Sequence, residues 1–118
     1  SQCISCIAGE FNSIPGSNNC IQCSAGSYTS NTGSTVCSSC AAGYYSTSSG
    51  ATSSSTCLPC FNGSFSIANA GSCQLCSPGT YSNIEGASFC KSCAAGKYSA
   101  GSGGSSSDSC VNCQPGFY

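Results

Sequence analysis

The chain has 118 residues, 14 of them cysteine, with two basic and three acidic side chains, no histidine and a net charge of −1 at pH 7. A cysteine content above about 8–10% in a short chain is typical of a disulfide scaffold, not of an ordinary globular domain. Two basic residues are too few to bind nucleic acid or an anionic membrane, and a chain without histidine has no imidazole base. Since the three carboxylates are scattered, we expect no enzyme, no cofactor and no metal site.

Large aliphatic side chains are too few to stabilise this chain by burial alone. There are ten of them, and ordering costs about 1.5 kcal/mol per residue. Crosslinks must therefore hold the chain, or it is disordered. No apolar run approaches the roughly 18–20 residues of a membrane span, and the chain opens at Ser1 with neither Met nor a signal segment. We expect the chain to be a piece cut from a longer array of a mature protein.

The cysteines form an internal repeat, because every one of them belongs to a Cys-x-x-Cys pair. In chain order the pairs are Cys3/Cys6, Cys20/Cys23, Cys37/Cys40, Cys57/Cys60, Cys73/Cys76, Cys90/Cys93 and Cys110/Cys113. Three residues after each pair comes a glycine: Gly9, Gly26, Gly43, Gly63, Gly79, Gly96 and Gly116. Two residues further on comes an aromatic: Phe11, Tyr28, Tyr45, Phe65, Tyr81, Tyr98 and Tyr118. A polar, serine-rich stretch then leads to the next pair.

A longer period is superimposed on the first. The first cysteines of successive pairs are 17, 17 and 20 residues apart, and the spacing then repeats as 16, 17 and 20. This pattern predicts two three-module blocks, residues 3–56 and 57–109.

The same residues predict the local structure. A glycine two places before an aromatic favours a turn with positive φ followed by a short extended segment. Ser77-Pro78-Gly79-Thr80 and Gln114-Pro115-Gly116-Phe117 carry the type II turn signature. We expect a short strand to begin at the aromatic, as in Tyr28-Thr29-Ser30 and Tyr81-Ser82-Asn83. Second turns are expected at Pro15-Gly16, Thr32-Gly33 and Glu85-Gly86.

These elements predict a small, disulfide-rich, mostly irregular fold with short β-hairpins and essentially no helix, since no window sustains a period of 3.6. The modules are expected to form an elongated, solenoid-like rod in which each contacts mainly its sequence neighbours. The repeated aromatics are expected to stack over a disulfide or a glycine, and a carbohydrate-binding platform is the alternative.

The unit Cys-x-x-Gly-x-Tyr resembles the ephrin-receptor-like cysteine-rich repeat, which is itself similar to the first half-module of tumour-necrosis-factor-receptor cysteine-rich domains. The resemblance implies that the second cysteine of each pair bonds the first of the next: Cys6–Cys20, Cys23–Cys37, Cys40–Cys57, Cys60–Cys73, Cys76–Cys90 and Cys93–Cys110. Six modules follow (6–20, 23–37, 40–57, 60–73, 76–90 and 93–110), with a truncated seventh from residue 113. Cys3 and Cys113 would then pair outside this chain. A loop of about 15 residues contributes roughly 3 kcal/mol in the chain-entropy model.

Zinc is the rival interpretation, because the spacing of the pairs alone does not exclude four-thiolate sites. Seven pairs is an odd number, however, and few basic residues are available to balance such anionic sites. A thioredoxin-like redox role needs a βαβ context that the sequence lacks.

Three further signals are weaker. Asn62-Gly63-Ser64 is a candidate N-glycosylation site. The serine runs 53–55 and 105–107 are flexible loop tips or O-glycosylation sites. Outside the aromatic register lie Phe61, Phe89 and Phe117, for which we expect local packing against a disulfide, with an exposed contact to a neighbour as the alternative.

Persistent disulfides place the protein in an oxidising compartment, so we expect it to be secreted, extracellular or at the cell surface. A nearly uncharged, hydroxyl-rich rod favours a structural role in a filament, appendage or cell-surface coat, since soluble stalks usually keep net charge away from zero. Its partners would be other copies of itself or neighbouring extracellular proteins, with glycans added. The alternative is a ligand-binding or spacer region of a cell-surface receptor or adhesion protein.

Overall fold

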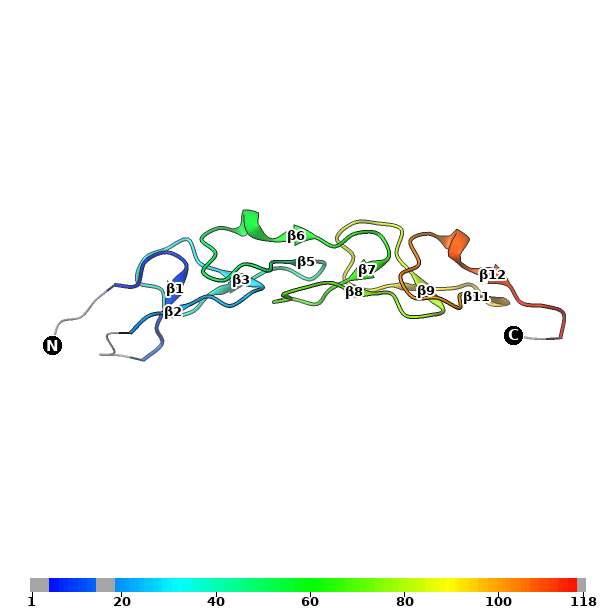
Figure 1. The fold of residues 1–118 in the computed structure, drawn as a ribbon, viewed down its shortest axis with the longest axis horizontal. Helices are drawn as coiled ribbons and strands as arrows, with labels where there is room; N and C mark the ends of the chain where they lie inside the picture. Colours follow the sequence, from blue (N-terminus) through cyan, green and yellow to red (C-terminus); the bar gives the residue numbers. More distant parts are fainter. Residues whose placement is uncertain (1–4, 15–18, 117–118) are drawn as a thin grey trace.

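The computed structural model describes residues 5–14 and 19–116 and has the form of a slender rod (Figure 1). Its principal extents are 76 × 21 × 15 Å and its radius of gyration is 19.9 Å. A globular chain of this length would have a radius of gyration of about 13 Å. The elongated, disulfide-rich fold without α-helix in the described ranges confirms the predicted fold class.

Within the described residues, six two-stranded antiparallel hairpins follow one another along the rod. In chain order they pair β1 (Glu10–Phe11) with β2 (Ile21–Gln22), β3 (Ser27–Tyr28) with β4 (Ser38–Ser39), β5 (Tyr44–Tyr45) with β6 (Leu58–Pro59), β7 (Ser64–Phe65) with β8 (Gln74–Leu75), β9 (Thr80–Tyr81) with β10 (Lys91–Ser92), and β11 (Lys97–Tyr98) with β12 (Val111–Asn112). Two short 3-10 turns, η1 (Ser54–Thr56) and η2 (Ser107–Ser109), complete the secondary structure of the described residues. The second strand of every hairpin is the pair of residues inside a Cys-x-x-Cys.

The first strand of each hairpin ends at the repeated aromatic, so the predicted strands beginning at Tyr28 and Tyr81 were placed too late. The first strand ends at the aromatic because the backbone N–H of the next residue bonds to the following repeat. Thr29 N–H donates to the Ala51 carbonyl at 3.1 Å and Ser82 N–H to that of Gly104 at 2.9 Å. The chain therefore leaves the hairpin immediately after the aromatic.

A type II turn precedes each first strand. In the turn before β9, Gly79 has a φ of 88° and Thr80 N–H donates to the Ser77 carbonyl at 3.0 Å, which is the geometry that Pro-Gly predicts. The second turns also need a positive φ, and in one of them Asn69 (φ 65°) takes the place that glycine holds elsewhere. Asparagine tolerates this conformation better than most residues. Of the expected second turns, Pro15-Gly16 lies outside the described residues.

The core consists of half-cystines, glycine, hydroxyl-bearing side chains and the two buried alanines Ala51 and Ala87. Four half-cystines are fully buried: Cys23, Cys40, Cys60 and Cys76. The buried polar side chains are all serine or threonine, and every buried side-chain oxygen or nitrogen of the described residues has a hydrogen-bond partner. The described residues include no helix with the length and apolar character needed to cross a bilayer.

Candidate functional site

Six disulfides link described residues along the rod, joining the cysteines that the resemblance implies: Cys6–Cys20, Cys23–Cys37, Cys40–Cys57, Cys60–Cys73, Cys76–Cys90 and Cys93–Cys110. We call each disulfide loop a module and number the modules 1 to 6 in that order. Each disulfide joins the cysteine that lies four residues before the first strand, ahead of the type II turn, to the cysteine directly before the second strand. The twelve sulfurs are thereby used in covalent bonds.

Backbone hydrogen bonds join each module to the next. At the junction of modules 3 and 4, the Cys60 amide donates to the Gly43 carbonyl and the Gly43 amide donates to the Ser66 carbonyl, both at 2.9 Å. In addition, the Asn69 backbone N–H donates to the Cys40 carbonyl, also at 2.9 Å. The same pattern recurs at the other junctions, with at least three such bonds at each. Consecutive modules are therefore hydrogen-bonded at several points and not merely linked through the chain.

Parallel β-bridges add a further link between neighbours. They pair the aromatic of one module with a residue before the cysteine pair of the next: Phe11 with Ser34, Tyr28 with Ala51, Tyr45 with Ala70 and Tyr81 with Gly104. In the same modules these aromatic side chains are half-buried, whereas Tyr98 is 49% exposed. Their stacking over disulfides stays a prediction, and Tyr118 lies outside the described residues.

The modules also interlock with their next-but-one neighbours. A Cβ added to Gly43 in module 3 would lie 2.1 Å from the Gly86 carbonyl oxygen in module 5. Equivalent close approaches bring Gly9 to Gly50, Gly26 to Asn69 and Gly63 to Gly103. The expectation that modules contact mainly their sequence neighbours is thus too narrow.

This close approach gives the repeated glycine a second role beyond its turn. In modules 1 to 4 the second-turn backbone of the module two further along fills the space beside it. Gly79, Gly96 and Gly116 keep the positive φ, but a Cβ added to any of them would meet nothing within 4 Å among the described residues.

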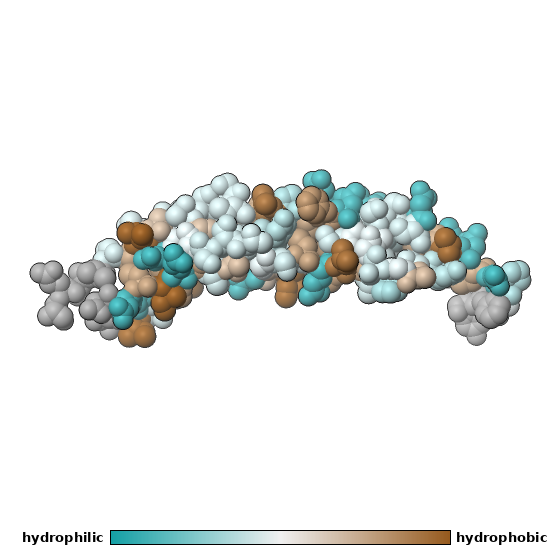
Figure 2. Space-filling view, in the orientation of Figure 1, coloured by the Kyte–Doolittle hydropathy of each residue, from teal (hydrophilic) through white to brown (hydrophobic). Residues whose placement is uncertain are grey.

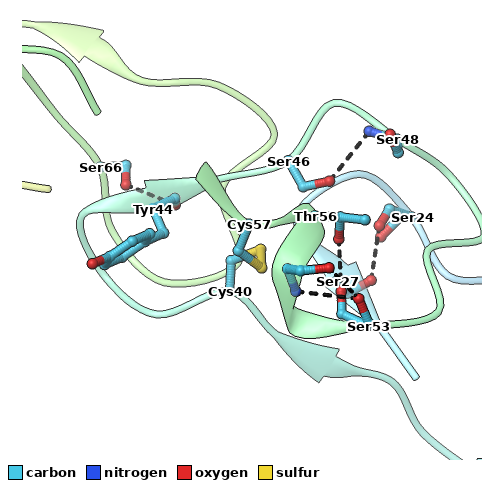
Figure 3. The surroundings of a disulfide bond; sticks show 11 residues. Ser24, Ser27, Cys40, Tyr44, Ser46, Ser48, Ser53, Thr56, Cys57 and Ser66 are labelled. Carbon is cyan, nitrogen blue, oxygen red and sulfur yellow. Dashed lines mark hydrogen bonds between the residues drawn. A yellow bond between two sulfur atoms is a disulfide. The ribbon is translucent and has the colours of Figure 1, made fainter. Parts of the chain in front are cut away.

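Hydroxyl groups surround the Cys40–Cys57 disulfide (Figure 3). The Ser66 hydroxyl donates to the Tyr44 carbonyl at 2.9 Å, so it links module 4 to module 3. Ser46 is 2% exposed, and its hydroxyl accepts a hydrogen bond from the Ser48 backbone N–H at 3.3 Å. The Tyr44 ring points away from the disulfide (Figure 3).

Sequence reasoning missed these buried hydroxyls, although their signal is present. In modules 2 to 6 the residue directly after the repeated aromatic is Ser or Thr, and each is buried: Thr29, Ser46, Ser66, Ser82 and Ser99. Their fixed distance from the aromatic marks them as part of the repeat. Serine-rich composition concealed the pattern, because serine is common throughout the connecting loops.

The surface is mostly neutral, with separate apolar and hydrophilic patches (Figure 2). Phe61 and Phe89 are 71% and 67% exposed, so the expectation that they pack locally is wrong, and Phe117 lies outside the described residues. Exposed phenylalanine is tolerated here because the module interior is only large enough for the disulfide and small side chains. An open depression of about 330 Å³ borders Phe65 and is otherwise lined by small, aliphatic and amide-bearing side chains, including Asn69 and Gln74. The carbohydrate alternative stays a prediction.

The remaining candidate residues lie apart from one another. Cys113 is a half-buried free thiol, and Cys3 lies outside the described residues. Asn62 is exposed in the type II turn of module 4. Across the described ranges, no three cysteine, histidine or carboxylate side chains come together in a way that could hold a metal ion.

Comparison with known proteins identifies the family of the repeat. The family model described as "Tyrosine-protein kinase ephrin type A/B receptor-like" matches residues 9–57 and 63–110, which together make up most of the chain. Each matched segment spans about three modules. No curated protein matches the sequence significantly. The match confirms the predicted resemblance to ephrin-receptor-like repeats, and this family is a non-catalytic extracellular domain.

Proposed function

Because the chain belongs to the ephrin type A/B receptor-like family of cysteine-rich repeats, we propose that it works as a stiff extracellular rod, a structural segment of a filament, appendage or cell-surface coat. The family and the six disulfides point to an extracellular or cell-surface location. The proposal concerns what the rod does there.

The observation that carries the proposal is the continuity of the junctions. Every junction between modules 1 to 6 has backbone hydrogen bonds to the next module, and modules 1 to 4 also meet the module two further along. A hinge needs a junction with few contacts, and these five junctions do not provide one. Such a rod transmits force and holds a fixed length.

The surface supports lateral packing. Hydroxyl-rich loops with three acidic and two basic side chains in the whole chain create little electrostatic repulsion between copies. Repeated modules present similar groups at regular intervals, so neighbouring rods can pair in register. Other copies of the chain are therefore the proposed partners, with glycans on the exposed loops.

Immunogold electron microscopy on the native source tests this role. Antibodies against modules 3 to 6 should label continuous filaments or a coat at regular spacing. Separate stalks that each end in a membrane anchor would contradict the proposal. That result would favour the second candidate, a spacer or ligand-binding region of a receptor or adhesion protein, which the receptor-type family match supports.

A further inference from the structure

The turn Phe61-Asn62-Gly63-Ser64 carries a side-chain amide, that of Asn62, which takes no part in the hydrogen bonds between modules. Asn62 is exposed, and its side-chain amide makes no hydrogen bond within the described part of the chain. Ser64 follows at the second position, so the turn contains the Asn-x-Ser acceptor of N-linked glycosylation.

The fold does not require asparagine at this position. The equivalent turn residue is alanine in modules 1, 2, 3 and 6 and proline in module 5: Ala8, Ala25, Ala42, Ala95 and Pro78. All of these precede a glycine with positive φ in the same kind of turn. Asn62 therefore adds a reactive amide to a turn that folds without one.

We propose that Asn62 carries an N-linked oligosaccharide and that it is attached before module 4 closes. In the transfer, the Asn62 Nδ2 atom forms a bond to the anomeric carbon of the sugar. The bond from that carbon to the pyrophosphate oxygen of a polyprenyl-linked oligosaccharide donor breaks, and the amide proton passes to a base of the transferase. The pyrophosphate leaves with its lipid.

The timing follows from the state of Ser64. This residue is 6% exposed, and its hydroxyl donates to the Phe61 carbonyl at 2.8 Å. Gly63, between the two acceptor residues, donates to the Ser82 carbonyl at 2.9 Å and accepts from the Cys76 amide at 2.8 Å. A transferase that must contact both the amide and the hydroxyl cannot reach the hydroxyl once these bonds have formed.

The glycosylation proposal requires only passage through a secretory compartment, so it can fail or hold independently of the filament role. Secretion of the protein from a eukaryotic cell line, followed by digestion with peptide N-glycosidase, tests it. The wild type should show a mobility shift that Asn62→Ala loses and Ser64→Thr retains. Absence of the shift in wild type, or its persistence in Asn62→Ala, would overturn the proposal. Alanine is the matched replacement because four other modules hold it at this position.

A transplanted acceptor provides the gain-of-function control. Pro78→Asn in module 5 creates the sequence Asn-Gly-Thr in an equivalent turn, where the exposed residue 78 precedes Gly79 and the Thr80 hydroxyl donates to the Ser77 carbonyl at 2.7 Å. This variant should gain a second glycan. Its failure to do so while the wild type is modified would contradict the view that this turn makes a competent acceptor.

The timing has its own test, which uses unglycosylated protein refolded from bacteria. Microsomal transferase and the lipid-linked donor should modify the reduced chain, and that modification should be lost once the six disulfides have formed. Equal modification of the oxidised and reduced protein would overturn the requirement for an open turn.

Discussion

Gly43 is the most crowded of the repeated turn glycines. Alanine there would need a φ near 91° and would place its Cβ 2.1 Å from the Gly86 carbonyl oxygen. The left-handed conformation costs about 1–2 kcal/mol, and overpacking adds about 1–3 kcal/mol. Gly43→Ala should therefore lower the free energy of unfolding by about 2–5 kcal/mol, measured by urea denaturation of the oxidised protein.

Gly96→Ala is the matched control, because Gly96 has a φ of 82° but nothing within 4 Å of the added Cβ. It should lose only the conformational part, about 1–2 kcal/mol. Equal destabilisation of the two variants would show that the contact between modules 3 and 5 contributes nothing to stability.

The buried hydroxyls should contribute individually small but measurable stability. Ser66→Ala removes the bond from the Ser66 hydroxyl to the Tyr44 carbonyl, and a hydrogen bond of this kind is worth about 1 kcal/mol net. The exposed Ser72→Ala should change stability by less than about 0.5 kcal/mol. Thermal unfolding of the oxidised variants gives the comparison, and an equal effect of both substitutions would argue against a structural role for the residue after the aromatic.

Single residues also show how far the sequence could be interpreted. The type II turn at Gly79 was predictable, because Pro-Gly determines both central φ angles. The second turn at Asn69 was missed, because only glycine was expected at a positive φ and asparagine also adopts it.

At the scale of elements, the repeat predicted the hairpins but not where their strands lie. The residues between paired cysteines, such as Ile21 and Gln22, form the second strand, which could not be recognised from a run of two residues without alternation. The close approach of Gly43 to Gly86 could not be predicted either, because it depends on the angle at which the modules stack. The positive φ of the turn was already a sufficient reason for a glycine at position 43. Local chemistry was therefore predictable and the interlocking of modules was not.

Removal of single disulfides separates loop closure from packing. Cys60–Cys73 spans 13 residues and Cys93–Cys110 spans 17, so chain entropy alone makes the second the more stabilising by about 0.2 kcal/mol. Each of these disulfides has one buried and one half-buried cysteine, but the first lies in module 4, which is hydrogen-bonded to modules 3 and 5, whereas the second lies in module 6, which among the six modules has only module 5 as an adjacent partner. The double alanine variant at 60 and 73 should therefore lose at least about 1 kcal/mol more than the one at 93 and 110. Urea denaturation measures both, and the opposite order would favour the purely entropic account.

At the scale of the whole molecule, two kinds of bond have different roles. The disulfides restrict each loop, and the backbone bonds between modules set the direction of the rod. Because the described modules bury no large aliphatic side chain, the hydrogen-bonded junctions have no hydrophobic layer to hold them once the loops open. Stiffness should therefore depend on oxidation along the whole chain.

Small-angle X-ray scattering with and without a reductant measures this dependence. The oxidised chain should have a radius of gyration near the 19.9 Å of the structure. Full reduction should unfold it, and an unfolded chain of 118 residues has a radius of gyration of about 35 Å. The value should change little with salt, since the chain has only five charged side chains. A reduced chain that stays near 20 Å would mean that the backbone bonds between modules maintain the rod without covalent closure of the loops.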